Sequence, residues 1–168
     1  AFGISNFDLQ VETNIVRPFT YTHNTLATSY THYNQPIAHP LGANFWEVLA
    51  IARYQLLPEL TAQMTMVYYQ KGLDGLGENW GGNIFTPNVN DADGLTVQQE
   101  FGNKIAQGVK QNVGLVDLLV SYQAFHNLFF DLNVMYRYSK CELERYNGSQ
   151  AYVGLGARLN IAWRGNYY

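Results

Sequence analysis

The feature that most constrains the fold is a long alternation of apolar and other side chains between residues 150 and 164. The odd-numbered positions are all apolar: Ala151, Val153, Leu155, Ala157, Leu159, Ile161 and Trp163. The even-numbered positions are Tyr152, Gly154, Gly156, Arg158, Asn160, Ala162 and Arg164. A period of two predicts a β-strand with one apolar face. Strands of soluble sheets average about 5–6 residues, so this longer alternation favours a strand that crosses a lipid bilayer.

Five further stretches alternate in a similar way. We predict strands at about residues 7–17, 45–57, 60–71, 113–125, 128–140 and 150–164. One parity of each stretch is mainly apolar, and the other carries most of the charge. The charged residues expected on the inner face are Asp8, Glu12, Glu47, Arg53, Asp117, Asp131, Arg137, Arg158 and Arg164. Because both signs are present, we expect internal salt bridges that fill a lumen rather than a charge-selective pore.

The connections between these strands alternate in length. Pro58-Glu59 and residues 125–127 are short, whereas the loops at 18–44, 72–112 and 140–149 are long. Outer-membrane barrels have short periplasmic turns and long extracellular loops. The sequence therefore predicts an all-β fold, an antiparallel up-and-down transmembrane β-barrel in the bacterial outer membrane. A soluble up-and-down barrel of the lipocalin type is the alternative.

Aromatic side chains near the predicted strand ends agree with a membrane location, since membrane interfaces favour amphipathic rings. They are Tyr54, Tyr68, Tyr122, Tyr136, Tyr138 and Trp163. Six strands are too few for a closed barrel, because single-chain outer-membrane barrels begin at about eight strands. An open edge in lipid would leave backbone groups unpaired. We therefore expect residues 1–168 to be the C-terminal part of one larger barrel domain, with a barrel shared between subunits as the alternative.

Composition narrows the class further. Charged residues make up 14% of the chain, against about 25% in typical soluble domains, whereas aromatic residues reach 15%. A net charge of -3 provides no basic surface, which argues against a nucleic-acid partner. The longest apolar run, residues 48–52, is too short for a transmembrane helix. Cys141 is the single cysteine and cannot form a disulfide within the chain.

Aromatic and amide side chains gather in the two longest loops. Aromatic rings stack on the apolar faces of sugars, and amide and imidazole groups bond sugar hydroxyls. We therefore predict glycan contact in the extracellular loops at Tyr30, His32, Tyr33, Asn34, Gln35, His39, Asn79 and Trp80. The alternative is that the same side chains pack a loop into the mouth of the barrel.

No metal or cofactor site is predicted. His23, His32 and His39 have no recognised ligand spacing. Residues 90–94, Asn-Asp-Ala-Asp-Gly, suggest a calcium loop, but the EF-hand register would put Val89 at the first position, where a carboxylate is needed. A plain Asp-Gly turn is the better interpretation.

Catalytic residues are not predicted either. Ser121 and Ser139 are expected to face the lumen, but no histidine shares a strand with either of them. His126 lies in a predicted periplasmic turn. A nucleophile needs a base within hydrogen-bond reach, so we find no catalytic triad and expect a protein that is not an enzyme.

Three blocks of sequence in the loops carry a family resemblance. They are residues 30–45 (Tyr-Thr-His-Tyr-Asn-Gln-Pro-Ile-Ala-His-Pro-Leu-Gly-Ala-Asn-Phe), 79–85 (Asn-Trp-Gly-Gly-Asn-Ile-Phe) and 101–108 (Phe-Gly-Asn-Lys-Ile-Ala-Gln-Gly). In this order they resemble Wzi-like capsule-assembly outer-membrane proteins of Bacteroidetes, a group that includes gliding-motility proteins of the RemB kind. The resemblance implies a barrel of roughly eighteen strands. It also implies a non-enzymatic role in binding, anchoring or organising surface polysaccharide.

The expected partners are therefore membrane lipid, surface polysaccharide and other outer-membrane proteins. Two further functions stay open from the sequence: an outer-membrane transport channel, and an accessory subunit of a cell-surface secretion or motility complex. An open lumen would distinguish the channel, and co-purification with other envelope proteins would distinguish the subunit.

Overall fold

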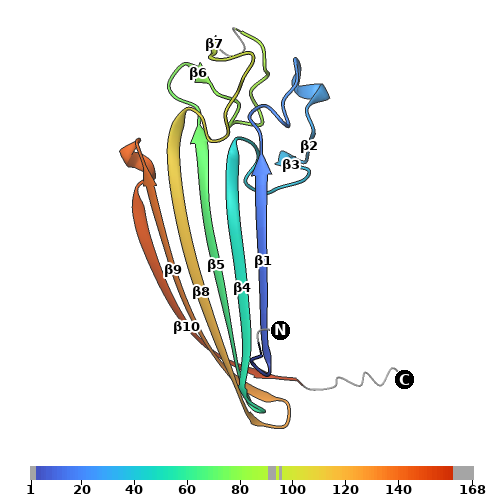
Figure 1. The fold of residues 1–168 in the computed structure, drawn as a ribbon, viewed down its shortest axis with the longest axis vertical. Coiled ribbons are helices and arrows are strands. Elements are labelled where there is room, and N and C mark those ends of the chain that lie inside the picture. The colour runs from blue at the N-terminus through green and yellow to red at the C-terminus, as the bar shows by residue number, and fades with distance from the viewer. Residues whose placement is uncertain (1–2, 91–93, 95, 161–168) are drawn as a thin grey trace, which may run out of the picture.

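The computed structural model describes residues 3–90, 94 and 96–160. Its main feature is one antiparallel sheet of six long strands: β1 (Phe7–Val16), β4 (Phe45–Leu57), β5 (Leu60–Leu73), β8 (Val109–Phe125), β9 (Leu128–Cys141) and β10 (Gly148–Leu159). Each strand lies beside its neighbour in sequence, in the order β1-β4-β5-β8-β9-β10 (Figure 1). The predicted all-β class and antiparallel sheet are confirmed.

The remaining elements are short and lie in the loops at one end of the sheet (Figure 1). They are the hairpin β2 (Thr31–His32) and β3 (Gln35–Pro36), the parallel pair β6 (Glu78–Asn79) and β7 (Thr96–Val97), and the 3-10 helices η1 (Leu26–Thr28) and η2 (Glu144–Tyr146). Among the described residues no helix has the length and apolar character needed to cross a membrane.

The strand bounds differ from the predicted ones mainly at the loop end. β4 has the predicted bounds, but β5 continues to Leu73 and β8 begins at Val109. The two extensions pair with each other, because Leu73 lies opposite Val109. At the other end β10 stops at Leu159, where residue 160 leaves the strand. The positions predicted to continue it, 161–164 with Trp163 and Arg164, lie outside the described residues.

The register separates the side chains into two faces. Residues directly opposite each other in an antiparallel pair point to the same side, so a pair such as Phe7 and Tyr54 defines one face and Asp8 and Arg53 the other. We call the first the apolar face. Within the six strands as described, it carries charge only at Lys110 and Lys140, which lie near the loop end. Many of its large apolar side chains stay exposed, as at Leu155 (85%).

The opposite side, the polar face, holds the other charged side chains of the strands, and several of them form short networks. Arg53 pairs with Asp8 at 2.9 Å, and Arg158 pairs with Asp131 at 3.2 Å. Ser121 donates a hydrogen bond to the same Asp131 carboxylate. These contacts agree with the predicted internal salt bridges.

Three of the other predicted charges are not in ion pairs in the part of the chain that the structure describes. Asp117 accepts a hydrogen bond from the Asn133 amide, and Glu12 accepts one from Asn14. Arg137 is in no recorded ion pair within these residues. The network on the polar face is therefore a mixture of ion pairs and neutral hydrogen bonds.

The buried core of this chain lies under the loops. Its buried apolar residues are Tyr21, Ala43, Phe45, Ile84, Ala106, Val113 and Cys141. A single sheet has no second layer to cover either face, so burial occurs only where the loops fold against the loop end of the strands. The best-packed region is thus also the region that carries the candidate site.

Candidate functional site

The two long loops, residues 17–44 and 74–108, are joined through one buried asparagine. Asn44 is fully buried and has a φ of 62°. Its Nδ2 donates to the carbonyl oxygens of Gly72 (3.1 Å) and Gln107 (2.8 Å). Its Oδ1 accepts from the backbone N–H of Gln107 at 3.1 Å. Asn44 therefore connects both loops to the end of β5, and we call the joined loops the loop layer.

A glycine permits this close contact. A Cβ at Gly72 would overlap the carbonyl oxygen of Gln107 and approach Nδ2 of Asn44. Any side chain at position 72 would thus push the two loops apart. Gly72, near the end of β5, is therefore required by packing rather than by a turn.

An aspartate organises the start of the second loop. One carboxylate oxygen of Asp74 accepts from the backbone N–H of Trp80 at 2.6 Å, and the other accepts from that of Asn83 at 2.9 Å. The N–H of Gly82 adds a longer bond of 3.4 Å. A carboxylate that accepts several backbone hydrogen bonds holds a tight turn, so Asp74 fixes the path of residues 80–83.

The first loop folds back onto the polar face at His39. Its Nε2 lies 3.0 Å from Oε2 of Glu47, and its Nδ1 accepts from the backbone N–H of Leu41. Since Nδ1 is an acceptor, Nε2 carries the proton and donates to Glu47. The imidazole also packs 4.6 Å from the Phe45 ring. The buried Tyr21 hydroxyl accepts from the His39 backbone N–H.

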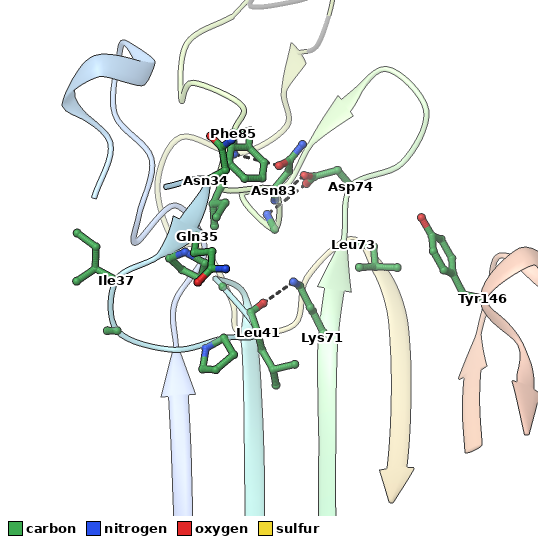
Figure 2. A pocket seen from close by; sticks show the side chains of 16 residues that line it. Asn34, Gln35, Ile37, Leu41, Lys71, Leu73, Asp74, Asn83, Phe85 and Tyr146 are labelled. Atoms are coloured by element: carbon green, nitrogen blue, oxygen red, sulfur yellow. Dashed lines mark hydrogen bonds between the residues drawn. The ribbon is translucent and has the colours of Figure 1, made fainter. Parts of the chain in front are cut away.

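A pocket of about 800 Å³ opens between these loops (Figure 2). Its polar lining comes from Asn34, Gln35, Asn83, Lys71 and Asp74. Its apolar lining includes Pro36, Ile37, Pro40, Leu41, Leu73, Ile84, Phe85 and Tyr146. Figure 2 places Ile37 on one side and Tyr146 on the other, so all three long connections contribute to the wall.

Lys71 supplies a cation to this pocket. It lies near the loop end of β5, beyond Tyr68, the last apolar side chain that this strand places on the apolar face. Its Nζ donates to the carbonyl oxygen of Leu41 (Figure 2). Burial lowers the pKa of Lys71 from its ordinary value of 10.5, and the nearby Asp74 carboxylate opposes part of that change. The pocket thus combines one ammonium group, one carboxylate, amides and aromatic rings.

The residues predicted from sequence fall into three places. Asn34 and Gln35 line the pocket. Tyr30, His32 and Tyr33 lie on the exposed outer side of the first loop, and Tyr33 is 87% exposed. The imidazole of His32 packs 4.2 Å from the Tyr33 ring. These three side chains are accessible but do not line the pocket.

The other three predicted residues take part in the internal framework of the loop layer. His39 makes the contacts described above. Asn79 is 1% exposed, donates to the carbonyl oxygen of Pro87 and accepts from the N–H of Gly81. The indole N–H of Trp80 donates to Glu78 at 2.8 Å. For these three side chains the packing alternative raised by the sequence describes their contacts.

Sequence reasoning predicted only Asn34 and Gln35 of the pocket lining, and the charged, amide and aromatic residues that it missed are Lys71, Asp74, Asn83, Phe85 and Tyr146. Asn83 and Phe85 belong to the block at 79–85 that carried the family resemblance, so that block held a usable signal. Lys71 and Asp74 lie at the end of a strand and look like ordinary strand-end charges. Tyr146 comes from the short helix η2 in a third connection, and nothing in its local sequence marks it.

A second, amide-rich pocket of about 730 Å³ lies elsewhere in the loop layer. Its lining includes Arg17, Asn24, Asn88, Asn90, Glu100 and Asn103. No group of three or more His, Cys, Asp or Glu side chains in the described part of the chain could hold a metal ion. Asp91 and Asp93, the carboxylates of the calcium alternative, lie outside the described residues.

Chemically, the first pocket can bind a polar, ring-shaped ligand. The amides of Asn34 and Gln35 offer donors and acceptors, and the exposed ring of Phe85 offers a flat apolar surface.

Comparison of the chain with models of known protein families, with curated proteins and with solved structures finds no match.

Proposed function

We propose that this chain forms part of the wall of an outer-membrane β-barrel whose loop layer binds surface polysaccharide, in the manner of the Wzi-like capsule-assembly and RemB-like gliding proteins that its loops resemble. The observation that carries the proposal is a combination. A pocket lined by amides and aromatic rings lies at the loop end of a sheet whose other side chains divide into one apolar and one polar face.

The apolar face supports contact with lipid. Its strands contain 10 to 17 residues, which is long enough to cross a bilayer, because a transmembrane β-strand needs about 9–11 residues. Aromatic side chains mark both ends of this face. Trp46, Tyr68 and Tyr138 are near the loops, whereas Phe7, Tyr54, Tyr122 and Phe130 are near the short turns. Aromatic girdles at this spacing are typical of outer-membrane barrels.

The two edges of the sheet support closure with further strands. Among the described residues, β1 pairs only with β4 and β10 pairs only with β9. In lipid each unpaired backbone group costs several kcal/mol, so an open sheet edge is not tolerated there. We propose that additional strands, from the same polypeptide or from another subunit, complete the barrel.

The loop layer supports binding rather than catalysis. Its polar groups converge on a pocket of about 800 Å³, which lies within the usual range of ligand sites. Phe85 and Tyr146 are exposed aromatic residues at its wall. Rings of this kind stack on the C–H faces of sugars, and amides bond their hydroxyls.

The test measures binding of the complete protein in detergent to polysaccharide extracted from the surface of the producing bacterium. Phe85→Ala should weaken binding about tenfold, because one stacking contact of this type contributes about 1–1.5 kcal/mol. The matched control is Phe101→Ala, which removes a more exposed ring of the same loop layer (79% exposed) that does not line the pocket. Equal dissociation constants for the two variants would show that the pocket does not hold the glycan.

A further inference from the structure

The apolar face has a slot just below the loop end of the strands. It has a volume of about 400 Å³, and its side-chain lining is Val48, Ala50, Met66, Tyr68, Gly114, Val116, Tyr136 and Tyr138. These residues form two rows across β4, β5, β8 and β9. One row is Val48, Tyr68, Gly114 and Tyr138, and the next is Ala50, Met66, Val116 and Tyr136.

Small side chains produce the slot, and rings border it. Ala50 is the small residue of one row, beside Met66, while Tyr68 and Tyr138 are the large residues of the other row. The Tyr138 ring leans over Gly114, where a Cβ would overlap its Cε1 atom. The position of the Tyr138 ring beside the slot therefore depends on a glycine at position 114.

A row of hydrogen-bonded polar side chains lies directly above the slot. Trp46 Nε1 donates to Gln70 at 3.3 Å, and Gln70 Nε2 donates to Asn112 at 2.8 Å. The Tyr68 hydroxyl also donates to the side-chain amide oxygen (Oδ1) of Asn112 at 3.2 Å. We call Trp46, Gln70 and Asn112 the amide belt. It ends the apolar surface abruptly on the side of the loops.

Two lysines accompany the amide belt, one in its row and one beyond it on the loop side. Lys140 lies opposite Asn112 in the β8–β9 pair, and Lys110 lies two residues further along β8 on the same face. Both are exposed. They are the charged side chains that the six strands, as described, place on the apolar face. Glu142 is the acidic neighbour, since its N–H bonds the Lys110 carbonyl oxygen, but no ion pair with either lysine is recorded in the described residues.

We propose that the slot is a binding site for an acidic, phosphorylated lipid of the outer leaflet, with one acyl chain between Tyr68 and Tyr138 and the phosphate at Lys140 and Lys110. The inference rests on the proposed insertion into the membrane. The order along the strands supports a lipid. The apolar slot is followed by a polar row that holds the amides and Lys140, and then by Lys110, which matches acyl chain, ester region and phosphate. A lysine next to an anionic lipid headgroup adds favourable electrostatic energy to the contact between chain and slot.

The test uses the complete protein in bilayers that contain lipids with brominated acyl chains. Trp46 packs against Tyr68 at the border of the slot, so bromine in the slot quenches its fluorescence, and a Trp46→Phe variant measures the signal of all other tryptophans. The probes are brominated phosphatidylglycerol and brominated phosphatidylcholine. We expect phosphatidylglycerol to bind at least about threefold more tightly, since two lysines contribute and Glu142 opposes them.

Charge variants then locate the site. The double variant Lys110→Gln/Lys140→Gln should abolish the preference, and Glu142→Gln should increase it. Ala50→Phe, which fills the slot without adding a tryptophan, should reduce slot quenching by both lipids. A relative binding constant near one in the wild type, or a preference that survives loss of both lysines, would overturn the proposal. Absence of quenching by either lipid would instead show that the protein has not inserted, which contradicts the proposed function itself.

A second copy of the chain is the other possible occupant of the slot. Native mass spectrometry of the same preparations distinguishes it from lipid. A dimer that Ala50→Phe converts to monomer would assign the slot to subunit contact and overturn the lipid proposal. A monomer that retains one acidic lipid, lost in the double lysine variant, is the expected result.

Discussion

At the scale of single residues, a few side chains connect segments that are far apart in the sequence. Asn44 bonds both ends of a connection that leaves β5 at Gly72 and returns at Gln107. Its positive φ favours asparagine over most residues, because asparagine tolerates the left-handed region. The position therefore has two separate requirements, a backbone conformation and a pair of amide bonds.

Substitution of Asn44 can separate these requirements. Asn44→Gly keeps the φ of 62° without strain but removes all side-chain hydrogen bonds. We expect the opening free energy of the loop layer to fall by about 2 kcal/mol, because buried backbone groups lose their partners, which makes exchange about thirtyfold faster. Hydrogen exchange of the peptide that contains Gln107 measures this. Asn24→Gly in an exposed part of the same loop is the control, and equal exchange in both variants would contradict the role of Asn44.

The buried cation Lys71 leads to a pH prediction. Burial lowers its pKa below 10.5, so the folded protein holds this proton less tightly than the unfolded chain does. The cost of the buried charge is present in full below the folded pKa and disappears as pH rises towards 10.5. Relative to Lys71→Met, the wild-type free energy of unfolding should therefore increase between neutral pH and 10.5. Denaturant titrations across that range test it, and parallel curves for the two proteins would contradict it.

At the scale of elements, β8 shows how one strand serves two environments. Leu118 lies between Met64 and Val134 on the apolar face, whereas its neighbour Leu119 lies between Gln63 and Asn133 on the polar face. Adjacent leucines of equal hydrophobicity thus have different surroundings. The alternation along the strand distinguishes them, because Leu119 shares its parity with Asp117 and Ser121, and the pairing with β5 and β9 agrees with it.

An arginine at each of these two positions tests the assignment of the faces. Near the bilayer midplane, a lipid-facing arginine costs about 2–4 kcal/mol, whereas lumen-facing positions tolerate charge. We expect Leu118→Arg to lower the free energy of unfolding in lipid vesicles by that amount, and Leu119→Arg to change it much less. Urea titration of the reconstituted protein is the measurement. Equal losses for both variants would mean that the apolar face does not contact lipid.

At the scale of the whole molecule, the open question is what covers the two edges of the sheet. The strands β1 and β10 lie at opposite edges of the six-stranded sheet (Figure 1). Each has backbone groups directed away from its recorded partner, β4 or β9. In a closed barrel those groups would be paired as fully as those of central strands.

Hydrogen exchange in reconstituted vesicles tests closure directly. We expect the outward-directed amides of β1 and β10 to exchange as slowly as amides of β5 and β8, which have a strand on both sides. The physical reason is that an edge amide open to solvent exchanges without any unfolding, whereas a paired one must first open. Fast exchange confined to β1 and β10 would show that the sheet is open under these conditions.

The strands could be predicted from the sequence because their information is local. Alternation with a period of two identifies both the strand and its face, and Pro58-Glu59 marks a tight turn between two such runs. β4 was predicted to the residue for this reason. The extension of β8 back to Val109 was missed because it depends on pairing with Leu73, which lies far away in the sequence.

The loop residues show the opposite case. Composition drew attention to the aromatic and amide side chains of the loops, but it could not separate Asn34, which lines the pocket, from Asn79, which is buried with its amide bonded to the backbone. Tyr146 joins the pocket from a third connection only because β9 and β10 bring it there. The sequence by itself determined the strands, their faces and the end of the sheet that carries the long loops, since these follow from side-chain alternation. Only the tertiary structure decided which loop side chains share a pocket, because that depends on how loops distant in sequence pack around Asn44.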